Sequence, residues 1–368
     1  MLDKFKFILK EKLGIEKVAL YTLKEKWNCV LYFGFENEPP DLNLEYELIK
    51  IKEISLFKSK TYDVFDIVIP VYHKDRPLAY VLIGDIDEHK QNVSPVIKHL
   101  PFIQTLTNII IVAIENKRLF KENLEKIALK KELELASKMQ TMLFPEELPN
   151  NSKFHFNAFY LPNQEVGGDY YDFIKLSDEE YLICIADISG KGLSAALLMS
   201  NFQANLRALC NYILDLKELA IELNKKVIQN AKGEKFITFF CARYNTVSRE
   251  LQYINLGHHP ALIFQDNKMN ELNKGSIGLG MLDELPQLEA GKISVANNAI
   301  LFLYTDGLTE NSNTKDEFFS LDQIEQIFMN NISDIVEIIN DKIINELIIH
   351  KGNNSFSDDI TMLTGKFF

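Results

Sequence analysis

Four short acidic motifs occur between residues 167 and 361 of this 368-residue chain, each next to an apolar, strand-like run. In every motif an aspartate is close to Gly, Ser or a second Asp, residues that allow the backbone to turn sharply. Hard divalent cations such as Mg²⁺ and Mn²⁺ prefer carboxylate and carbonyl oxygens, whereas zinc and copper sites use His or Cys. The motifs are GGDYYD at 167–172, ADISGKG at 186–192, YTDG at 304–307 and SDDIT at 357–361.

Together the motifs predict a metal-assisted hydrolase that acts on an anionic substrate, most simply a phosphate ester. The first three motifs supply Asp169, Asp187 and Asp306, and the last supplies Asp358 or Asp359. In a β-like segment adjacent side chains point to opposite faces. One residue of the last pair is therefore expected to contact a metal ion, and the other to support it by hydrogen bonding.

The overall composition is that of a soluble globular protein, with 46% hydrophobic and 25% charged residues. A chain of this length predicts two or more domains. The net charge of −12 argues against a nucleic-acid-binding protein, because such surfaces are rich in Lys and Arg.

The cysteines and the hydropathy pattern indicate a cytoplasmic protein. The four cysteines are widely spaced, and Cys184 and Cys241 lie inside apolar runs, which predicts buried, reduced thiols rather than disulfides or a zinc site. The longest apolar run, IIIVAI at 109–114, is far shorter than the roughly 20 residues that span a bilayer, so no membrane segment is expected.

Residues 1–100 alternate short strand patterns with turns. The clearest pattern lies at 62–86, where two β-rich runs flank the turn sequence HKDRP at 73–77 and predict a hairpin. This arrangement, followed by a long helix, resembles the GAF family of small sensory domains. A PAS-like or another α/β sensor domain is the alternative.

Residues 101–146 predict a long linker helix, because apolar residues recur at three-to-four spacing and the stretch from 117 contains no Gly and no Pro before Pro145. The apolar stripe changes register near Leu129, so a strict coiled-coil period is not sustained. Two readings stay open: a dimerising signalling helix, or a helix that packs on its own domain. The stripe comprises Leu106, Ile110, Ala113, Phe120, Leu124 and Ile127, continuing as Leu133, Ala136 and Leu143 or as Leu135, Met139 and Met142.

Residues 147–368 alternate strand-like runs with helical stretches expected at 193–210, 216–231, 321–330 and 333–349. This order predicts an α+β domain, a β-sandwich flanked by helices. Five motifs in order, EVGGDYYDFI, ADISGKGLSAALLMS, INLGHHPALI, LFLYTDGLTE and SDDITML, give the region a resemblance to the PPM or PP2C-type serine/threonine phosphatases of the bacterial SpoIIE/RsbU-like branch.

The resemblance implies a PP2C-like sandwich with two Mn²⁺ or Mg²⁺ ions, which activate a water molecule so that no protein nucleophile is required. By motif position, the catalytic and metal-binding acids are those of the four motifs, with Asp358 favoured over Asp359 as the direct ligand. The carbonyl of Ile188 takes the place of a backbone ligand. The resulting set is Asp169, Asp187, Ile188, Asp306, Asp358 and Asp359.

Two departures from the wider family qualify this assignment. Gln164 occupies the position nearest to that of a phosphate-binding arginine, and a neutral amide cannot replace a guanidinium. A catalytic-acid histidine is not evident near Asp169. His258 and His259 are candidates for that role or for a structural turn, and Lys191 is either a phosphate-binding or a merely exposed residue.

The leading hypothesis is a cytoplasmic phosphatase whose N-terminal sensory domain regulates the activity through the linker helix. Homodimerisation is an expectation that rests on this linker helix. The substrate is a phosphoserine or phosphothreonine protein, for which a phosphorylated STAS-domain anti-sigma-factor antagonist in a partner-switching pathway is the candidate. The helix after Gly192 is either a switch element beneath the metal loops or an inert core helix. The competing hypothesis is a non-catalytic pseudophosphatase that binds phosphorylated partners.

Overall fold

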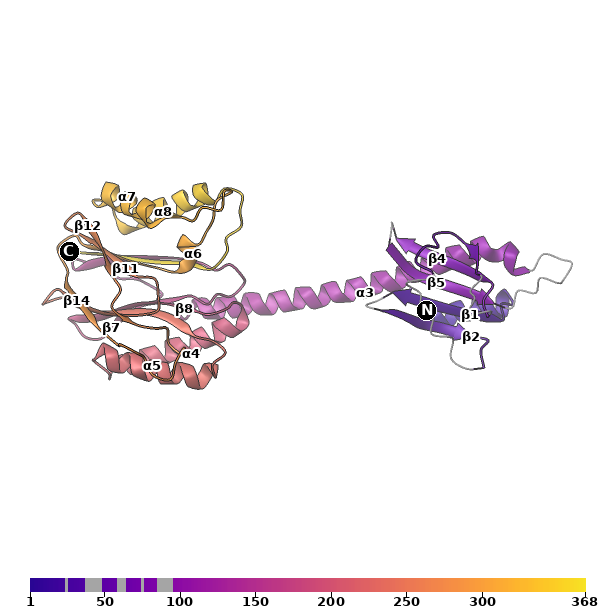
Figure 1. Cartoon of the computed structure of the whole chain (residues 1–368), viewed down its shortest axis with the longest axis horizontal. Helices are drawn as coiled ribbons and strands as arrows, with labels where there is room; N and C mark the ends of the chain where they lie inside the picture. Colours follow the sequence, from indigo (N-terminus) through magenta and orange to yellow (C-terminus); the bar gives the residue numbers. More distant parts are fainter. Residues whose placement is uncertain (24–25, 37–47, 58–63, 74–75, 85–94) are drawn as a thin grey trace. The chain divides into compact units, whose positions relative to one another are not determined.

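The computed structural model describes residues 1–23, 26–36, 48–57, 64–73, 76–84 and 95–368. The chain divides into two compact units, Met1–Ala128 and Leu129–Phe368. Figure 1 shows the elements of each unit. Within the described ranges, no helix has both the length and the apolar character that crossing a lipid bilayer requires.

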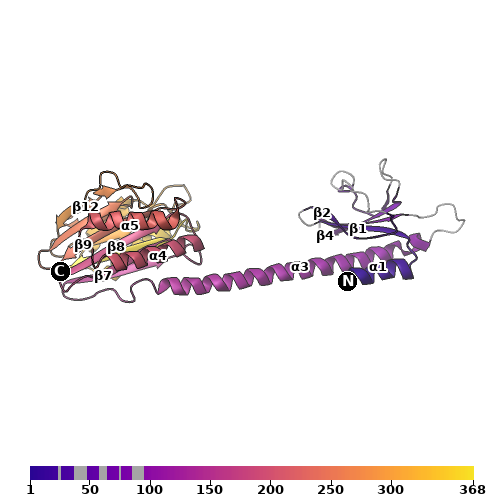
Figure 2. The ribbon, with the colours of Figure 1, turned by 90° about the horizontal axis from the view of Figure 1, so that it is seen from below.

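The first unit contains a five-stranded antiparallel sheet with the strand order β2-β1-β5-β4-β3. Its helices cover one face of this sheet, where Phe5 and Leu9 pack with Ile103 and Ile110 (Figure 2). The elements are α1 (Leu2–Phe7), the π-helical turn η1 (Ile8–Lys12), β1 (Lys17–Leu23), β2 (Trp27–Phe33), β3 (Ser55–Leu56), β4 (Ile67–His73), β5 (Arg76–Gly84) and the first part of α3 (Pro95–Thr141).

The hairpin predicted in this unit is confirmed. Strands β4 and β5 pair antiparallel, with His73 opposite Arg76 at the end of the ladder. Lys74 and Asp75 of the predicted turn lie outside the described residues.

Helix α3 begins six residues earlier than expected, at Pro95 rather than near Pro101. Pro101 lies inside the helix, where it removes one backbone hydrogen bond without ending the helix. The helix ends at Thr141, three residues before Phe144. Phe144 precedes Pro145, and a proline disfavours the helical conformation in the residue before it.

The second unit is a sandwich of two sheets. One sheet has the order β13-β10-β9-β8-β7 with β14 beside β10, and the other has the order β12-β11-β15-β16-β6. Helices α4 and α5 cover the outer face of the first sheet, and α7 and α8 cover the outer face of the second (Figure 1). This architecture confirms the predicted α+β sandwich flanked by helices.

The helices and strands of the second unit follow the predicted alternation. The predicted helices agree with the observed ones to within three residues at each end. Helix bounds are α4 (Leu193–Leu209), α5 (Leu216–Ala231), α6 (Asp306–Thr309), α7 (Leu321–Asn331) and α8 (Val336–Lys351). Strand bounds are β6 (Phe154–Leu161), β7 (Tyr170–Lys175), β8 (Glu180–Ile188), β9 (Ile237–Asn245), β10 (Glu250–Leu256), β11 (Ala261–Gln265), β12 (Lys268–Leu272), β13 (Gly275–Ser276), β14 (Gly291–Ser294), β15 (Ile300–Tyr304) and β16 (Ile360–Phe367).

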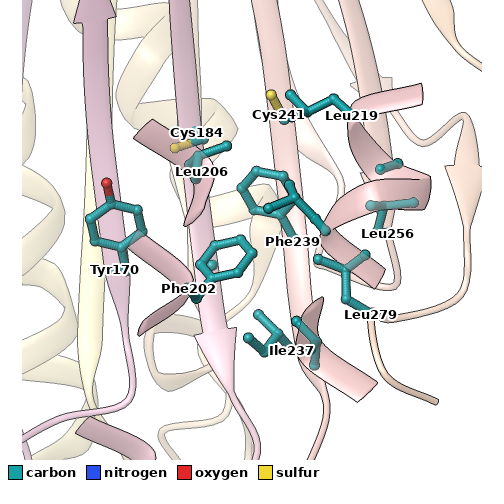
Figure 3. Close-up of a cluster of buried hydrophobic side chains, with 14 of the residues drawn as sticks. Tyr170, Cys184, Phe202, Leu206, Leu219, Ile237, Phe239, Cys241, Leu256 and Leu279 are labelled. Carbon is teal, nitrogen blue, oxygen red and sulfur yellow. The ribbon is translucent and has the colours of Figure 1, made fainter. Parts of the chain in front are cut away.

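Strand β8 is buried on both faces, which explains its continuous apolar sequence. Ile183 and Ile185 face the core between the sheets, whereas Leu182 and Cys184 face the helices α4 and α5. Figure 3 shows the helix-side cluster, in which Phe202 of α4 lies beside Phe239 with ring centroids 5.0 Å apart. All four cysteines are free thiols and three are buried, as the sequence predicted.

Phe202→Ala tests how far this cluster holds α4 on the sheet. Phe202 is 2% exposed, so truncation leaves a cavity and is expected to destabilise the protein by about 3–5 kcal/mol. Urea unfolding followed by circular dichroism measures the change. Leu197→Ala on the same helix, where the side chain is 63% exposed, is the control and should change stability by under about 1 kcal/mol. Equal effects of the two substitutions would contradict this account of the core.

Candidate metal and active site

The acidic motifs lie at one end of the sandwich, at the ends of four strands. Asp169 directly precedes β7, and Asp187 is the next-to-last residue of β8. Asp306 begins α6 just after β15, and Asp359 directly precedes β16. Antiparallel pairing within each sheet, Tyr170 with Ala186 and Tyr304 with Met362, brings each pair of motifs to the same end.

Hydrogen bonds to Asp169 join the two sheets at this end. Its Oδ2 accepts from Thr305 Oγ1 at 2.8 Å and from Thr361 Oγ1 at 2.5 Å. Asp169 is 1% exposed, and burial together with the charge of Asp187 raises the pKa of its carboxyl well above the usual value. Neither threonine was predicted to have a role, although Thr305 lies within YTDG and Thr361 within SDDIT.

The other carboxylates of the acidic motifs repel one another. Burial, followed by the charges of Asp306 and Asp358, raises the pKa of Asp187 to about 7. Burial and the charge of Asp358 also raise the pKa of Asp306. Such repulsion between carboxylates is relieved by a bound cation. Because the clustered donors are oxygens, this donor set fits Mg²⁺ or Mn²⁺.

Asp358 and Asp359 have different partners, as expected for adjacent residues in an extended segment. The two oxygens of Asp359 accept hydrogen bonds from the backbone N–H groups of Asn163 and Gly168, both at 2.7 Å. Asp358 Oδ2 lies 3.0 Å from Lys191 Nζ. Asp359 thus holds the loop that precedes Asp169, and direct metal contact by Asp358 stays a prediction.

Two glycines allow the motif loops to approach one another closely. A Cβ atom at Gly168 would lie 3.0 Å from the carbonyl oxygen of Ile188 and 3.5 Å from Asp187 Oδ1. A Cβ atom at Gly307 would lie 1.8 Å from the backbone oxygen of Asp359, a distance that no side chain permits. The Ile188 carbonyl predicted as a backbone ligand therefore lies beside Asp187 and against the Asp169 loop.

The end of α3 contacts the same loop through a buried side chain that the sequence analysis missed. Gln140 Nε2 donates to the carbonyl oxygen of Gly167 at 2.7 Å, and Gln140 Oε1 accepts from the Gly167 N–H at 3.1 Å. The only sequence signal is a polar residue between the apolar Met139 and Met142. Phe144, three residues beyond Thr141, packs against Tyr171 with the rings tilted and their centroids 4.9 Å apart.

The two adjacent histidines occupy different environments. His258 is buried, with Nδ1 2.9 Å from Thr238 Oγ1 and Nε2 3.1 Å from the carbonyl oxygen of Tyr304. Burial lowers the pKa of His258 to about 3, so the ring is neutral and connects β9 to β15. His259 instead lies near Asp306 and Glu310, with one potential ligand atom of each within 4.8 Å of the others.

Asp172, the second acid of GGDYYD, faces away from the other acids. Its carboxylate accepts from Arg207 Nε at 2.7 Å and from Arg207 Nη2 at 3.0 Å, and it also accepts from the Tyr170 hydroxyl. These contacts fasten β7 to α4. Lys191, in addition to its ion pair with Asp358, donates to the Ser357 carbonyl oxygen at 2.6 Å, so it contacts the acidic cluster directly.

Residues 177–368 match the family described as stage II sporulation protein E (SpoIIE). The phosphoserine phosphatase RsbU of Bacillus subtilis is 30% identical over 184 residues, which cover 50% of this chain and 54% of RsbU. The phosphoserine phosphatase RsbP of the same organism is 28% identical over 191 residues, covering 50% of this chain and 47% of RsbP. The chain thus spans about half the length of these curated relatives.

Solved structures share the fold of the second unit. The SiaA-PP2C domain of Pseudomonas aeruginosa aligns with a TM-score of 0.60 at 18% identity, covering 66% of this chain and 99% of that domain. The structure of the PP2C phosphatase domain of Bacillus subtilis SpoIIE, with a fragment of its regulatory domain, aligns with a TM-score of 0.50 at 15% identity, covering 60% and 64%. These likenesses show a PP2C-like fold.

The raised pKa of Asp187 predicts how the metal-free protein responds to pH. A carboxyl whose folded pKa is about 7 contributes stability below its unfolded pKa of roughly 4, and this contribution is lost as pH rises through 7. Asp187→Asn removes the charge, so with EDTA at pH 8 the variant should unfold roughly 3 °C or more above the parent protein. The difference should shrink at pH 5.

Differential scanning calorimetry at both pH values measures this effect. Asp178→Asn is the control, because the Asp178 side chain is 94% exposed. A variant less stable than the parent at pH 8, or a difference independent of pH, would contradict the repulsion described above.

Proposed function

Because the chain belongs to the SpoIIE family and its second unit has a PP2C-like fold, we propose that it is a metal-dependent serine/threonine phosphoprotein phosphatase. The observation that carries this proposal is the gathering of the motif acids at one end of the sandwich. Burial and mutual repulsion raise the pKa values of Asp169, Asp187, Asp306 and Asp359. A protein that only binds partners has no use for such an arrangement.

We assign two Mn²⁺ or Mg²⁺ ions to this cluster. The ligands are Asp169, Asp187, Asp306 and Asp358 with the carbonyl of Ile188, and Asp359 is a further ligand or a support. Bound divalent ions supply the positive charge that activates water and offsets charge on a phosphoryl group. Thr305 and Thr361 orient the Asp169 carboxylate by donating to the same oxygen, Oδ2.

The proposed substrate is a phosphoserine or phosphothreonine in a protein, supported by the similarity to RsbU and RsbP, both named phosphoserine phosphatases. A phosphorylated STAS-domain anti-sigma-factor antagonist in a cytoplasmic partner-switching pathway is the specific candidate. All four motif acids are present in one cluster, which favours catalysis over a non-catalytic pseudophosphatase.

We further propose that residues 1–100 form a GAF-like sensory domain and that residues 101–146 transmit its state. Two contacts near the end of this segment support its role in transmission. Gln140 forms hydrogen bonds with both the N–H and the carbonyl group of Gly167, and the ring of Phe144 packs against that of Tyr171. A displacement of the helix end would move the loop that carries Asp169. Helix α4, which follows Gly192, is a second element whose movement would shift Asp187.

The proposed homodimer rests on exposed apolar side chains of α3 and of Met142, which directly follows the helix. Six of them are exposed and form two runs with the spacing of a helix–helix interface. A second copy of the same helix would bury both runs at once. The runs are Phe120, Leu124 and Ile127, followed by Leu135, Met139 and Met142.

Hydrolysis of an aryl phosphate and of a phosphoserine protein by the full chain tests the activity. Turnover should require Mn²⁺ or Mg²⁺, stop with EDTA, and fall at least about 100-fold in Asp187→Ala and Asp306→Ala because each variant loses a direct ligand. Asp178→Ala, at an exposed acid, should retain activity. Absence of turnover in folded parent protein at saturating metal would favour the non-catalytic pseudophosphatase. Turnover that persists in both ligand variants would contradict the site.

Light scattering after size-exclusion chromatography tests the dimer. Leu124→Glu with Leu135→Glu should convert a dimer to a monomer, because each places a charge in the proposed interface. Replacing two exposed lysines of the same helix, Lys121→Gln and Lys131→Gln, lowers the net charge by the same amount as the two Leu→Glu substitutions and controls for the change in charge. A dimer with a Kd of about 1 µM would be mostly intact at 50 µM protein, roughly fifty times that Kd. A parent protein that is monomeric at this concentration would contradict the proposal.

A further inference from the structure

Lys191 carries a positive charge to the acidic cluster from the loop between β8 and α4. Its Nζ lies 3.0 Å from Asp358 Oδ2 and donates to the Ser357 carbonyl oxygen at 2.6 Å. The residue belongs to ADISGKG and its partners to SDDIT, so this side chain joins two of the acidic motifs across the two sheets. The Lys191 side chain is 40% exposed and that of Asp358 39%, so the ion pair is open to solvent.

The other basic side chains nearby have different partners. Lys235 Nζ donates to the Ser189 carbonyl oxygen at 2.7 Å and so holds the backbone of the same loop. Arg207 pairs with Asp172, which faces away from the cluster. Among the ion pairs of the described residues, the pair of Lys191 with Asp358 is the one that places a cation on an acid of the proposed metal site.

The acids of the cluster oppose the approach of a phosphate ester, because a phosphoryl group is itself anionic. Divalent cations offset part of this repulsion, and a positively charged side chain beside them adds a charge-assisted hydrogen bond to a phosphoryl oxygen. An ammonium group suits this role, because it is a compact charge with three N–H donors on a flexible four-carbon stem. Lys191 has such a group at the solvent-exposed side of Asp358.

Asp358 connects this lysine to the proposed metal ions. A divalent cation bound to its carboxylate would compete with the ammonium group for the same oxygens, and the two positive charges would repel each other. The stem of Lys191 is flexible and part of it is exposed, so the ammonium group can turn from Asp358 to an anion that arrives from solvent.

We propose that Lys191 binds the phosphoryl group of the substrate, and that its ammonium group competes with divalent cations for Asp358. The inference rests on the phosphatase function proposed above and adds to it a substrate-binding residue from the chain itself. The position of Lys191 also favours an anion, because it lies just before α4, a helix with no side-chain cap and no acid in its first turn.

Calorimetric titration of the full chain with inorganic phosphate, at saturating Mg²⁺ and constant ionic strength, tests phosphate binding. Lys191→Met should weaken the binding about tenfold or more, because it removes a charge-assisted hydrogen bond. Lys191→Arg should retain most of the affinity, because it keeps the positive charge.

Lys217→Met is the matched control, because Lys217 is an exposed lysine of α5 and its replacement changes the net charge equally. Arg243 donates to the carbonyl oxygen of Leu214 and pairs with Glu180 at the start of β8. The start of α5 therefore lies at the end of β8 opposite to Asp187, and the control should bind phosphate as the parent does.

Titration with Mn²⁺ in the absence of phosphate, with the free ion measured by electron paramagnetic resonance, tests the competition. Lys191→Met should bind Mn²⁺ more tightly than the parent by roughly two- to fivefold, the effect of removing one exposed ion pair. If Lys191 only held the two motif loops together, its loss would weaken Mn²⁺ binding. An Mn²⁺ affinity that is weaker than that of the parent, or equal to it, would thus overturn the proposal.

Hydrolysis of an aryl phosphate by the same proteins separates this proposal from the proposed function. Hydrolysis by the parent, with equal phosphate affinity in the parent and Lys191→Met, would overturn the role of Lys191 and leave the phosphatase activity standing. Absence of hydrolysis, with phosphate binding that depends on Lys191, would overturn the activity and support the phosphate site. Absence of phosphate binding to the parent up to about 20 mM, well above a millimolar Kd, would overturn this proposal whether or not hydrolysis occurs.

Discussion

Repulsion between buried carboxylates is the constraint on which the organisation of the second unit depends. Asp169 and Asp187 come from one sheet, and Asp306 and Asp358 flank strands of the other, so their charges meet only when the two sheets stack. The apolar core between the sheets provides the driving force for this stacking. The fold thus uses hydrophobic burial to hold together groups that would otherwise separate.

Uncharged hydrogen-bond donors hold the mutually repelling carboxylates in position. Thr305 and Thr361 donate to Asp169, and backbone N–H groups donate to both oxygens of Asp359. These donors orient the carboxylates without neutralising them. Lys191 forms an ion pair with Asp358, and Arg207 pairs with Asp172, which faces away from the other acids. The cluster therefore receives little compensating positive charge from the protein itself, and divalent cations, which bind to carboxylate oxygens, would supply that charge.

The sequence was most informative where function depends on local chemistry. The acidic motifs, the hairpin at His73 and the four helices of the second unit could all be predicted from spacing and turn residues. Gln140, Thr305 and Thr361 could not, because their roles arise from contacts with residues that are distant in sequence. The start of α3 was misplaced because Pro101 is typical of a first helical turn, yet a helix tolerates it further in. Sequence patterns thus predict the reactive acids, but they do not predict the residues that form hydrogen bonds with those acids or with their loops.

Gln140 satisfies both the N–H and the carbonyl group of Gly167, as a neighbouring strand does in an antiparallel ladder. A single side chain therefore takes the place of a missing strand at the edge of the Asp169 loop. Two bonds at one buried position form or break together, and a state with only one of them leaves a polar group without a partner. A displacement of Gln140 would therefore remove two hydrogen bonds at once from the loop that carries Asp169.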